Sequence, residues 1–562
     1  MASFLSEPAQ QALNADLPSL VLSSAFLGVL SHVSLFRTLP VDDYMYSLLG
    51  FYAATIVAIT AASFYLTTFS ILQTLLRVGS IASAFNLGLF VSIAIYRLFF
   101  HRLRRFPGPW LSKLTRFYDT YLAGKNVQYH EEVAKMHAKY GDFFRTGPRE
   151  ICIVRKSAVP LLLSAQSTCK KSTFYAQTEI EPKNCNVHQT RDFEDHRRRR
   201  KAWDRGFNLK ALASYEPRVR GKVDLLISRL ESQGEEIDIT TWAMFLSFDI
   251  MGVVGFGKEF NNLVTGVEHP GIKAVHDHMA MLGTMGHIPW LLNLISHIPG
   301  ATAGMTGFFS WCEDEVVQKF KRWDINEEPQ DVVSWLLKAY VEKDVSAPPS
   351  ANALHQDSRA VLVAGSETTA TTLASVIYYF CKNPNVLKKL QRLLDEAMPG
   401  PSDWTYDKVK NISYLEDIIT ETLRLRPAVL TGGYRVTPAE GLQVDEVWIP
   451  GDVNVFVPTQ VLQTDERYYV DAKAFVPERW SEKKEMVHEG APYFPFLYGP
   501  YICPGKQLAL MSLRISVSKL AQLFDMRFAP GETGELFETK TMDTFTTTLP
   551  PLNVQFVPRS GR

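Results

Sequence analysis

The chain has 562 residues, of which 46% are hydrophobic and 21% are charged, a length that exceeds one average domain and allows a large core. Its 59 basic and 59 acidic residues cancel, which argues against a chain built mainly to bind nucleic acid. The six cysteines form no CxxC pair, which argues against a disulfide framework or a zinc site and for a reducing compartment.

The first hundred residues differ in composition from the rest of the chain. They hold only seven Lys, Arg, Asp or Glu residues, and stretches without a charge cover residues 17–36, 44–76 and 78–96. Each stretch is long enough to span a hydrocarbon core about 30 Å thick. We therefore expect residues 1–100 to form a membrane region with two or three transmembrane helices; buried core helices are the alternative.

A short basic and proline-rich segment, HRLRRFPGPW at residues 101–110, follows the last apolar stretch. Positive residues beside a span are retained on the cytoplasmic side of the membrane. This segment is therefore expected to act as a stiff hinge, with the bulk of the chain after it in the cytosol.

Two segments in the middle of the chain allow more than one interpretation. Residues 195–207, DHRRRRKAWDRGF, carry a dense basic run, which is usually a solvated helix face and less often a nucleic-acid site. The apolar segment at residues 287–299 is too short to span a membrane and contains prolines. It is either a core segment or a connection that dips into the membrane.

Residues 359–380 predict one long helix that is interrupted only by Gly365. A glycine inside a helix costs about 1 kcal/mol relative to alanine, so a compensating role is expected. One such role is close packing on a neighbouring helix. The other is a groove beside Glu367 and Thr368, whose carboxylate and hydroxyl are suited to proton transfer.

A helix beginning near Tyr414 and ending at ETLRLRP places Glu421 and Arg424 on one face, because they are three positions apart. Alone, such a pair is an ordinary surface ion pair worth about 0 to 1 kcal/mol. Short strands are expected after Tyr434 and around residues 545–556. The segment FVPERW, which contains Arg479, lies between this helix and the last motif.

That last motif is FLYGPYICPG at residues 496–505, where glycines and prolines surround Cys503. A lone cysteine is most often a small buried side chain. Here the glycines would let backbone N–H groups approach the sulfur and stabilise a thiolate.

Taken in this order, the motifs resemble those of the cytochrome P450 family. The cysteine loop is similar to the family's haem-binding pattern F-x-x-G-x-R-x-C-x-G at Phe496, Gly499, Cys503 and Gly505. It departs from that pattern at Tyr501, where the family has a basic residue. AGSETT is similar to A-G-x-[DE]-T-[TS], and ETLRLRP with PERW is similar to the family's buried Glu–Arg–Arg cluster. The resemblance extends from about residue 101 to the end of the chain.

The resemblance implies a mainly α fold with small β-sheets, preceded by transmembrane helices, in which residues 111–562 form a haem-thiolate catalytic domain. Haem b would be bound through its iron by the Cys503 thiolate. Thr368 and Glu367 would be the catalytic residues that contact dioxygen and deliver protons. A structural cluster would consist of Glu421, Arg424 and Arg479.

The resemblance also implies which residues face the haem propionates: His196, in the place of the family's tryptophan, with Arg200 and Arg435. The other basic residues of 195–207 would form a surface for an acidic electron-donor protein. Tyr501 can donate a hydrogen bond to a propionate but cannot neutralise it.

The function implied is a monooxygenase that oxidises a lipophilic small molecule with dioxygen and with electrons from NADPH through cytochrome P450 reductase. The motifs are similar to those of fungal members, many of which act on terpenoids, polyketides or alkaloids. The resemblance also implies an enzyme anchored in the endoplasmic reticulum with its catalytic domain facing the cytosol. Two other hypotheses remain open. One is a haem-thiolate isomerase or dehydratase that uses no dioxygen, and the other is a non-enzymatic membrane receptor or transporter. Glu367 and Thr368 count against the first, and uncharged spans count against the second.

Overall fold

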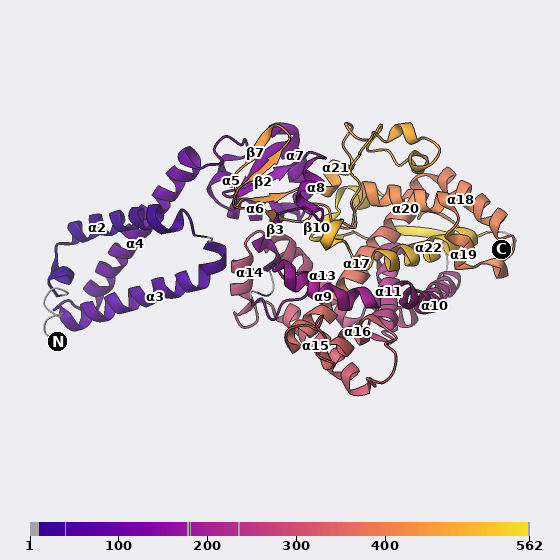
Figure 1. Ribbon diagram of the computed structural model, residues 1–562, viewed down its shortest axis with the longest axis horizontal. Helices are drawn as coiled ribbons and strands as arrows, with labels where there is room; N and C mark the ends of the chain where they lie inside the picture. The colour runs from indigo at the N-terminus through magenta and orange to yellow at the C-terminus, as the bar shows by residue number, and fades with distance from the viewer. Residues whose placement is uncertain (1–9, 40, 177–178, 180, 234–235, 560–562) are drawn as a thin grey trace. The chain divides into compact units, whose positions relative to one another are not determined.

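The structure is a computed structural model that describes residues 10–39, 41–176, 179, 181–233 and 236–559 (Figure 1). The described residues fall into two compact units. Unit 1 lies within residues 1–116 and 145–149, and unit 2 lies within residues 117–144 and 150–562.

Unit 1 consists of the helices α2 (Leu17–Ser31), α3 (Val41–Leu66), α4 (Ile71–Ile95) and α5 (Trp110–Leu114). Helices α2 and α4 lie side by side (Figure 1). They approach so closely that a Cβ atom at Gly28 would collide with the carbonyl oxygen of Phe85. Small residues allow such backbone contact between membrane helices. A polar side chain of α2 also bonds to the backbone of α4: Ser24 Oγ donates to the Ile81 carbonyl over 2.8 Å.

Three helical segments of unit 1 are long and apolar enough to cross a membrane: Leu17–Phe36, Val41–Leu66 and Ile71–Phe100. Their most apolar windows are only 17%, 6% and 22% buried. Two segments of unit 2 have similar length and composition, but their windows are 89% and 67% buried. Long apolar helices with this much exposed surface are compatible with membrane anchoring, as the sequence predicts.

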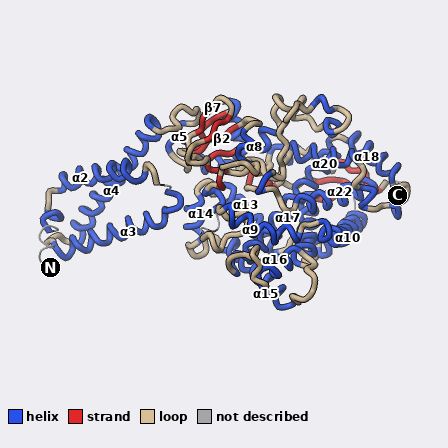
Figure 2. The backbone as a smooth tube through the Cα atoms, viewed as in Figure 1, coloured by secondary structure: helices blue, strands red, loops and turns tan. Residues whose placement is uncertain are grey.

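Unit 2 is mainly helical, with strands only in small sheets (Figure 2). Its α-helices are α6 (Phe117–Asn126), α7 (Tyr129–Tyr140), α8 (Ala158–Leu163), α9 (Phe193–Gly206), α10 (Leu209–Gln233), α11 (Ile239–Met251), α12 (Asn262–Thr265), α13 (Pro270–Met285), α14 (Pro289–Ser296), α15 (Ala303–Arg322), α16 (Val332–Val341), α17 (Ala351–Lys382), α18 (Pro384–Ala397), α19 (Tyr406–Val409), α20 (Ser413–Leu425), α21 (Thr459–Gln463), α22 (Lys506–Leu523) and α23 (Glu535–Thr539).

The strands form four small sheets with the orders β1-β2-β8-β5-β3, β4-β12-β9, β6-β7 and β10-β11. In β3–β5 the pairing is antiparallel and sets Lys171 opposite Arg435. The predicted fold class, mainly α with small β-sheets, is confirmed. The strands are β1 (Phe143–Gly147), β2 (Glu150–Ile153), β3 (Lys170–Lys171), β4 (Glu236–Asp238), β5 (Arg435–Val436), β6 (Leu442–Val444), β7 (Val447–Ile449), β8 (Asn454–Phe456), β9 (Phe524–Phe528), β10 (Met542–Thr544), β11 (Thr546–Thr548) and β12 (Asn553–Pro558).

Helix α17 is the long helix predicted around Gly365, and it packs on α11, α15, α20 and α22. A Cβ atom at Gly365 would lie 2.5 Å from the sulfur of Met251 on α11. The glycine therefore permits close packing of α11 on α17. The ambiguous apolar segment at residues 287–299 contains α14, which buries Pro289, Leu292 and Asn293.

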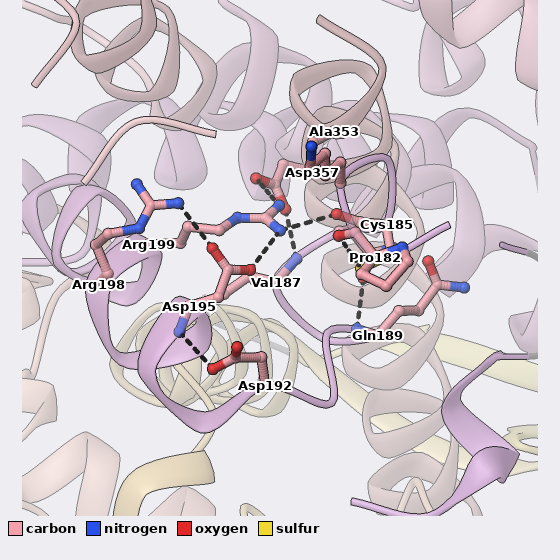
Figure 3. Close-up of polar contacts among 12 residues, drawn as sticks. Pro182, Cys185, Val187, Gln189, Asp192, Asp195, Arg198, Arg199, Ala353 and Asp357 are labelled. Carbon is pink, nitrogen blue, oxygen red and sulfur yellow. Dashed lines mark hydrogen bonds and ion pairs between the residues drawn. The ribbon is translucent and has the colours of Figure 1, made fainter. Parts of the chain in front are cut away.

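The basic run on α9 contributes a buried ion pair with α17 (Figure 3). Arg199 Nη2 donates to Asp357 Oδ2 over 2.8 Å, and both side chains are 1% exposed. Arg199 also donates to the Cys185 carbonyl, and the Val187 N–H donates to Asp357. The expectation that this residue belongs to a basic surface is wrong, because α17 presents a buried carboxylate to it.

We predict that Asp357→Leu destabilises unit 2 by about 3–5 kcal/mol, because it removes the 2.8 Å ion pair of Arg199 and leaves this buried guanidinium only its 3.4 Å ion-pair contact with Asp195. Urea unfolding of the purified chain measures the loss. Glu194→Gln is the matched control, since Glu194 pairs with Arg197 on the same helix but both are about two-thirds exposed. The control should change the free energy of unfolding by less than about 1 kcal/mol. Equal effects of the two substitutions would contradict the structural role of the buried pair.

Candidate active site

Unit 2 encloses a cavity with a volume of about 460 Å³, and its walls include Cys503 and Thr368. The helices α9, α11, α15 and α17 and the loop before α22 supply much of its lining. The described lining residues include no Asp or Glu. They do include basic side chains, which are Lys171, His188, His196, Arg200, Arg359 and Arg435.

The cysteine loop presents Cys503 to this cavity. The Cys503 N–H donates to the Phe496 carbonyl over 3.0 Å, which closes the loop just before α22 begins at Lys506. Burial raises the pKa of the Cys503 thiol. The N–H groups of Gly505 and Lys506 and the charge of Arg200 act against this rise in the pKa, because they favour the thiolate. These donors at the start of a helix are the surroundings that a cysteine needs to act as a thiolate ligand.

Gly499 fixes the shape of this loop. Its φ is +71°, in the left-handed region, and a Cβ atom there would collide with the Leu163 carbonyl oxygen. Only glycine meets both conditions without strain. Phe496, Cys503 and Gly505 line the cavity, and Gly499 shapes the loop that carries them. The four residues that match the haem-binding pattern therefore lie in one loop at the cavity.

Tyr501 lies among three basic side chains. The Lys171 Nζ is 4.7 Å and the Arg435 Cζ is 4.8 Å from the centre of its ring. The ring centre of His196 is 4.6 Å from that of Tyr501. The predicted residues His196 and Arg435 are therefore brought together around Tyr501, and Lys171 joins them.

Lys171 and Arg435 face each other across β3 and β5, although they are only 4% and 1% exposed. Their hydrogen bonds to described residues go to neutral groups: Lys171 Nζ donates to the His188 carbonyl over 2.6 Å, and Arg435 Nη1 donates to the Tyr175 hydroxyl over 3.1 Å. Among the described residues, neither forms an ion pair with a carboxylate. Like charges placed opposite each other in a sheet are destabilising.

Two buried nitrogen atoms in this group, His196 Nδ1 and Arg435 Nε, have no hydrogen-bond partner in the part of the chain that the structure describes. Burial and the nearby Arg435 hold the pKa of Lys171 well below its usual value. Burial and the charge of Lys171 lower the pKa of His196 to about 2. The group therefore has the character of an anion site that needs negative charge, and the two propionates of a haem have that chemistry.

Arg200 lines the cavity and also contacts the backbone of the cysteine loop. Its Nη1 donates to the Ile502 carbonyl over 2.5 Å, and its Nε donates to Asp204 Oδ1 over 2.8 Å. Its charge acts on Cys503 and on His196. Arg200 is thus placed beside the thiol as well as toward the cavity.

The two predicted catalytic residues differ in their relation to the cavity. Thr368 lines it and its Oγ1 donates to the Ala364 carbonyl over 2.7 Å. Glu367 is 5% exposed and does not line it. Instead, Glu367 Oε2 accepts a hydrogen bond of 2.5 Å from Thr546 Oγ1 on β11. Thr546 does line the cavity, so it is a residue of the site that no motif indicates.

The structure also brings Glu421, Arg424 and Arg479 together, each with no exposed side-chain surface. Arg424 donates two hydrogen bonds of 2.8 Å to the Glu421 carboxylate, and Arg479 Nε donates a third of 2.8 Å. Trp480 Nε1 donates to the same carboxylate over 3.0 Å. This buried carboxylate is therefore held by a bidentate guanidinium and by further donors, the arrangement that a buried charge requires.

Comparison with known proteins agrees with this geometry. A model of the cytochrome P450 family matches residues 107–556. The chain belongs to the cytochrome P450 family. The fold is also similar to that of a solved structure. A crystal structure of a cytochrome P450 superposes on this chain with a TM-score of 0.64 at 21% sequence identity, over 76% of this chain and 94% of that chain.

Among similar curated cytochrome P450 proteins, the monooxygenase FCK2 of Fusarium pseudograminearum is 36% identical over 95% of this chain and 97% of its own length. The monooxygenase orf5 of Eupenicillium brefeldianum is 38% identical over 85% of this chain and 96% of its own. Tryprostatin B 6-hydroxylase of Aspergillus fumigatus is 30% identical over 91% of each chain.

The chain is therefore a cytochrome P450 monooxygenase, an oxidoreductase that incorporates oxygen. This finding replaces the alternatives of an isomerase, a dehydratase, a receptor or a transporter. Membership of the family implies haem with cysteine-thiolate ligation, a redox partner and a lipophilic substrate.

We predict that Gly499→Ala lowers the free energy of unfolding by more than Gly531→Ala does. Both glycines have a positive φ, but a Cβ atom at Gly531 meets open space, whereas one at Gly499 meets the Leu163 backbone. The control should show only the left-handed strain of about 1–2 kcal/mol. Chemical unfolding of both variants measures the difference, and equal losses would mean that the loop accommodates the collision.

Proposed function

We propose that Cys503 supplies the thiolate ligand of a haem b iron in this monooxygenase. The observation that carries the proposal is the position of Cys503 on the cavity wall, at the start of α22, with the Gly505 and Lys506 N–H groups acting on its sulfur. A haem with this ligand supplies the activation of dioxygen. The residues of the chain hold the haem, exclude water and position protons.

Lys171, His196, Arg200 and Arg435 are the residues to which we assign the haem propionates. Buried guanidinium and ammonium groups need a carboxylate partner; Arg200 has Asp204, but the described part of the cavity wall offers none to Lys171 or Arg435. Tyr501 contributes a ring between the cations and a hydroxyl that can donate a hydrogen bond. In this proposal Lys171 provides the positive charge that the family pattern places at position 501.

Thr368 offers a hydroxyl at the cavity wall, and Glu367 holds its carboxylate on the Thr546 hydroxyl. We assign these three residues to the handling of protons beside the cavity. When Glu367 is protonated, it can donate its proton to Thr546 Oγ1 while that hydroxyl donates its own proton into the cavity, so a proton moves without Glu367 itself reaching the cavity.

The proposed organisation keeps the boundaries expected from the sequence: a membrane region at residues 1–100, a hinge at 101–110 and a catalytic domain at 111–562. The proposed location is the endoplasmic reticulum, with the catalytic domain facing the cytosol and electrons coming from NADPH through cytochrome P450 reductase. Exposed basic residues of α9 such as Arg197 suit an acidic donor protein. A secondary metabolite of terpenoid, polyketide or alkaloid type is the proposed substrate, and the fungal relatives support it.

We predict that Cys503→Ala abolishes the thiolate-type Soret shift of the reduced carbon monoxide complex. Absorbance spectra of the purified full chain measure the shift. Cys381→Ala is the matched control, because Cys381 is a part-buried cysteine that does not line the cavity. A normal shift in the Cys503 variant would refute the ligand assignment and the proposed function with it.

We predict that Lys171→Met speeds haem loss about 10- to 100-fold, the range expected for a lost charged hydrogen bond of about 1.5–3 kcal/mol. Haem transfer from the loaded enzyme to excess apomyoglobin measures the rate. Lys170→Met is the control, because Lys170 is the neighbouring residue of β3 but is exposed. Equal rates in the two variants would show that Lys171 does not hold the haem.

A further inference from the structure

Arg359 places a second positive charge in the cavity wall, separate from the group around Tyr501. It lies on α17, six residues before Gly365. Its guanidinium carbon is 3.5 Å from the ring centre of Phe309 on α15, so the guanidinium covers that ring. Neither Lys171 nor Arg435 is among the groups whose charges act on Arg359.

No carboxylate among the described residues forms an ion pair with Arg359. Its Nη2 donates to Gln356 Oε1 over 2.9 Å, and Gln356 in turn donates to Glu179 over 3.3 Å. The charge of Glu179 acts on Arg359, but the two form no ion pair, because the neutral amide of Gln356 bridges them. Burial lowers the pKa of Arg359 to about 10, so the side chain stays charged at neutral pH. A partly buried charge of this kind is costly unless an anion completes it.

Much of the cavity wall is apolar and adaptable. Sulfur-containing and aromatic side chains accommodate a flat, lipophilic molecule. The residues concerned in the cavity wall are Met251, Met279, Met305, Phe308 and Phe309.

We infer that Arg359 binds an acidic group of the substrate, so that the substrate class is an apolar, aromatic-rich carboxylic acid. A guanidinium whose face stacks on an aromatic ring still offers N–H groups along its edge, and this fork matches the two oxygens of a carboxylate. The inference rests on the proposed function, because it takes the cavity above Cys503 to be the substrate site.

The position of Arg359 on α17 also orients the substrate. Arg359 and Thr368 are nine residues apart on one helix, which is roughly 13 Å along its axis. The acidic group is then held far from Thr368, and oxidation takes place toward the opposite end of the molecule.

Equilibrium dialysis of the full-length, haem-loaded enzyme in detergent micelles tests this inference at neutral pH. The probes are biphenylacetate and its neutral analogue biphenylacetamide, which have nearly the same shape. The wild-type enzyme should bind the acid at least 10-fold more tightly than the amide, and Arg359→Met should remove this preference. Arg359→Lys should keep part of it, because it retains the charge but not the fork. Arg322→Met, an exposed arginine of α15, should leave the preference unchanged.

Two results would overturn the inference. One is equal binding of acid and amide by the wild-type enzyme. The other is an Arg359→Met variant that weakens both probes equally, since that is the result of a merely structural or neutral contact. The carbon monoxide spectrum of the same samples separates this failure from failure of the proposed function. An enzyme with the thiolate band but no acid preference refutes the role of Arg359 alone, whereas loss of the band in the wild-type enzyme refutes the function.

Discussion

Buried positive charge without a carboxylate partner is the constraint on which the active site depends. Lys171 and Arg435 oppose each other across two short strands, and both are almost fully buried. A folded chain tolerates such a pair only when something else compensates the repulsion. The described wall of the cavity has no acidic side chain to do so. We propose that an anionic cofactor compensates the charges of Lys171 and Arg435, and that an acidic group of the substrate compensates the charge of Arg359.

Elsewhere in unit 2, two buried carboxylates, Asp357 and Glu421, accept hydrogen bonds from arginines and join separate segments of the fold. Asp357 joins α17 to α9, the helix that carries His196 and Arg200. Glu421 joins α20 to the PERW segment through Arg424 and Arg479. The two kinds of site differ in one respect. In the supporting clusters each carboxylate is paired with arginines, and these pairs stabilise the fold. In the cavity, Lys171 and Arg435 have no carboxylate partner among the described residues, so they can bind an anionic ligand.

What the sequence revealed was local in character. Cys503, Gly499 and Phe496 belong to one loop, and Glu421 and Arg424 belong to one helical turn, so spacing alone brought them together. Composition indicated the membrane-compatible helices of unit 1 but not their bounds, because Arg77, which separates two charge-free stretches in the sequence, lies inside α4.

What the sequence did not reveal depends on the pairing of distant segments. Lys171 comes from a strand of two residues and enters the site only through its register with Arg435. Thr546 reaches Glu367 across 179 positions of sequence. Arg199 has the same local pattern as its exposed neighbours, and only the position of Asp357 makes it a buried structural residue. No periodicity within a single segment contains these facts.

An experimental structure of the haem-loaded enzyme tests the central claim most directly, through the distances from the propionate oxygens to the basic side chains around Tyr501. The account predicts hydrogen bonds from Lys171 Nζ and from the Arg435 guanidinium to the propionate oxygens, with His196 Nδ1 facing the same group. Propionates that point to solvent or to other residues, with Lys171 and Arg435 still facing each other without an anion, would contradict it.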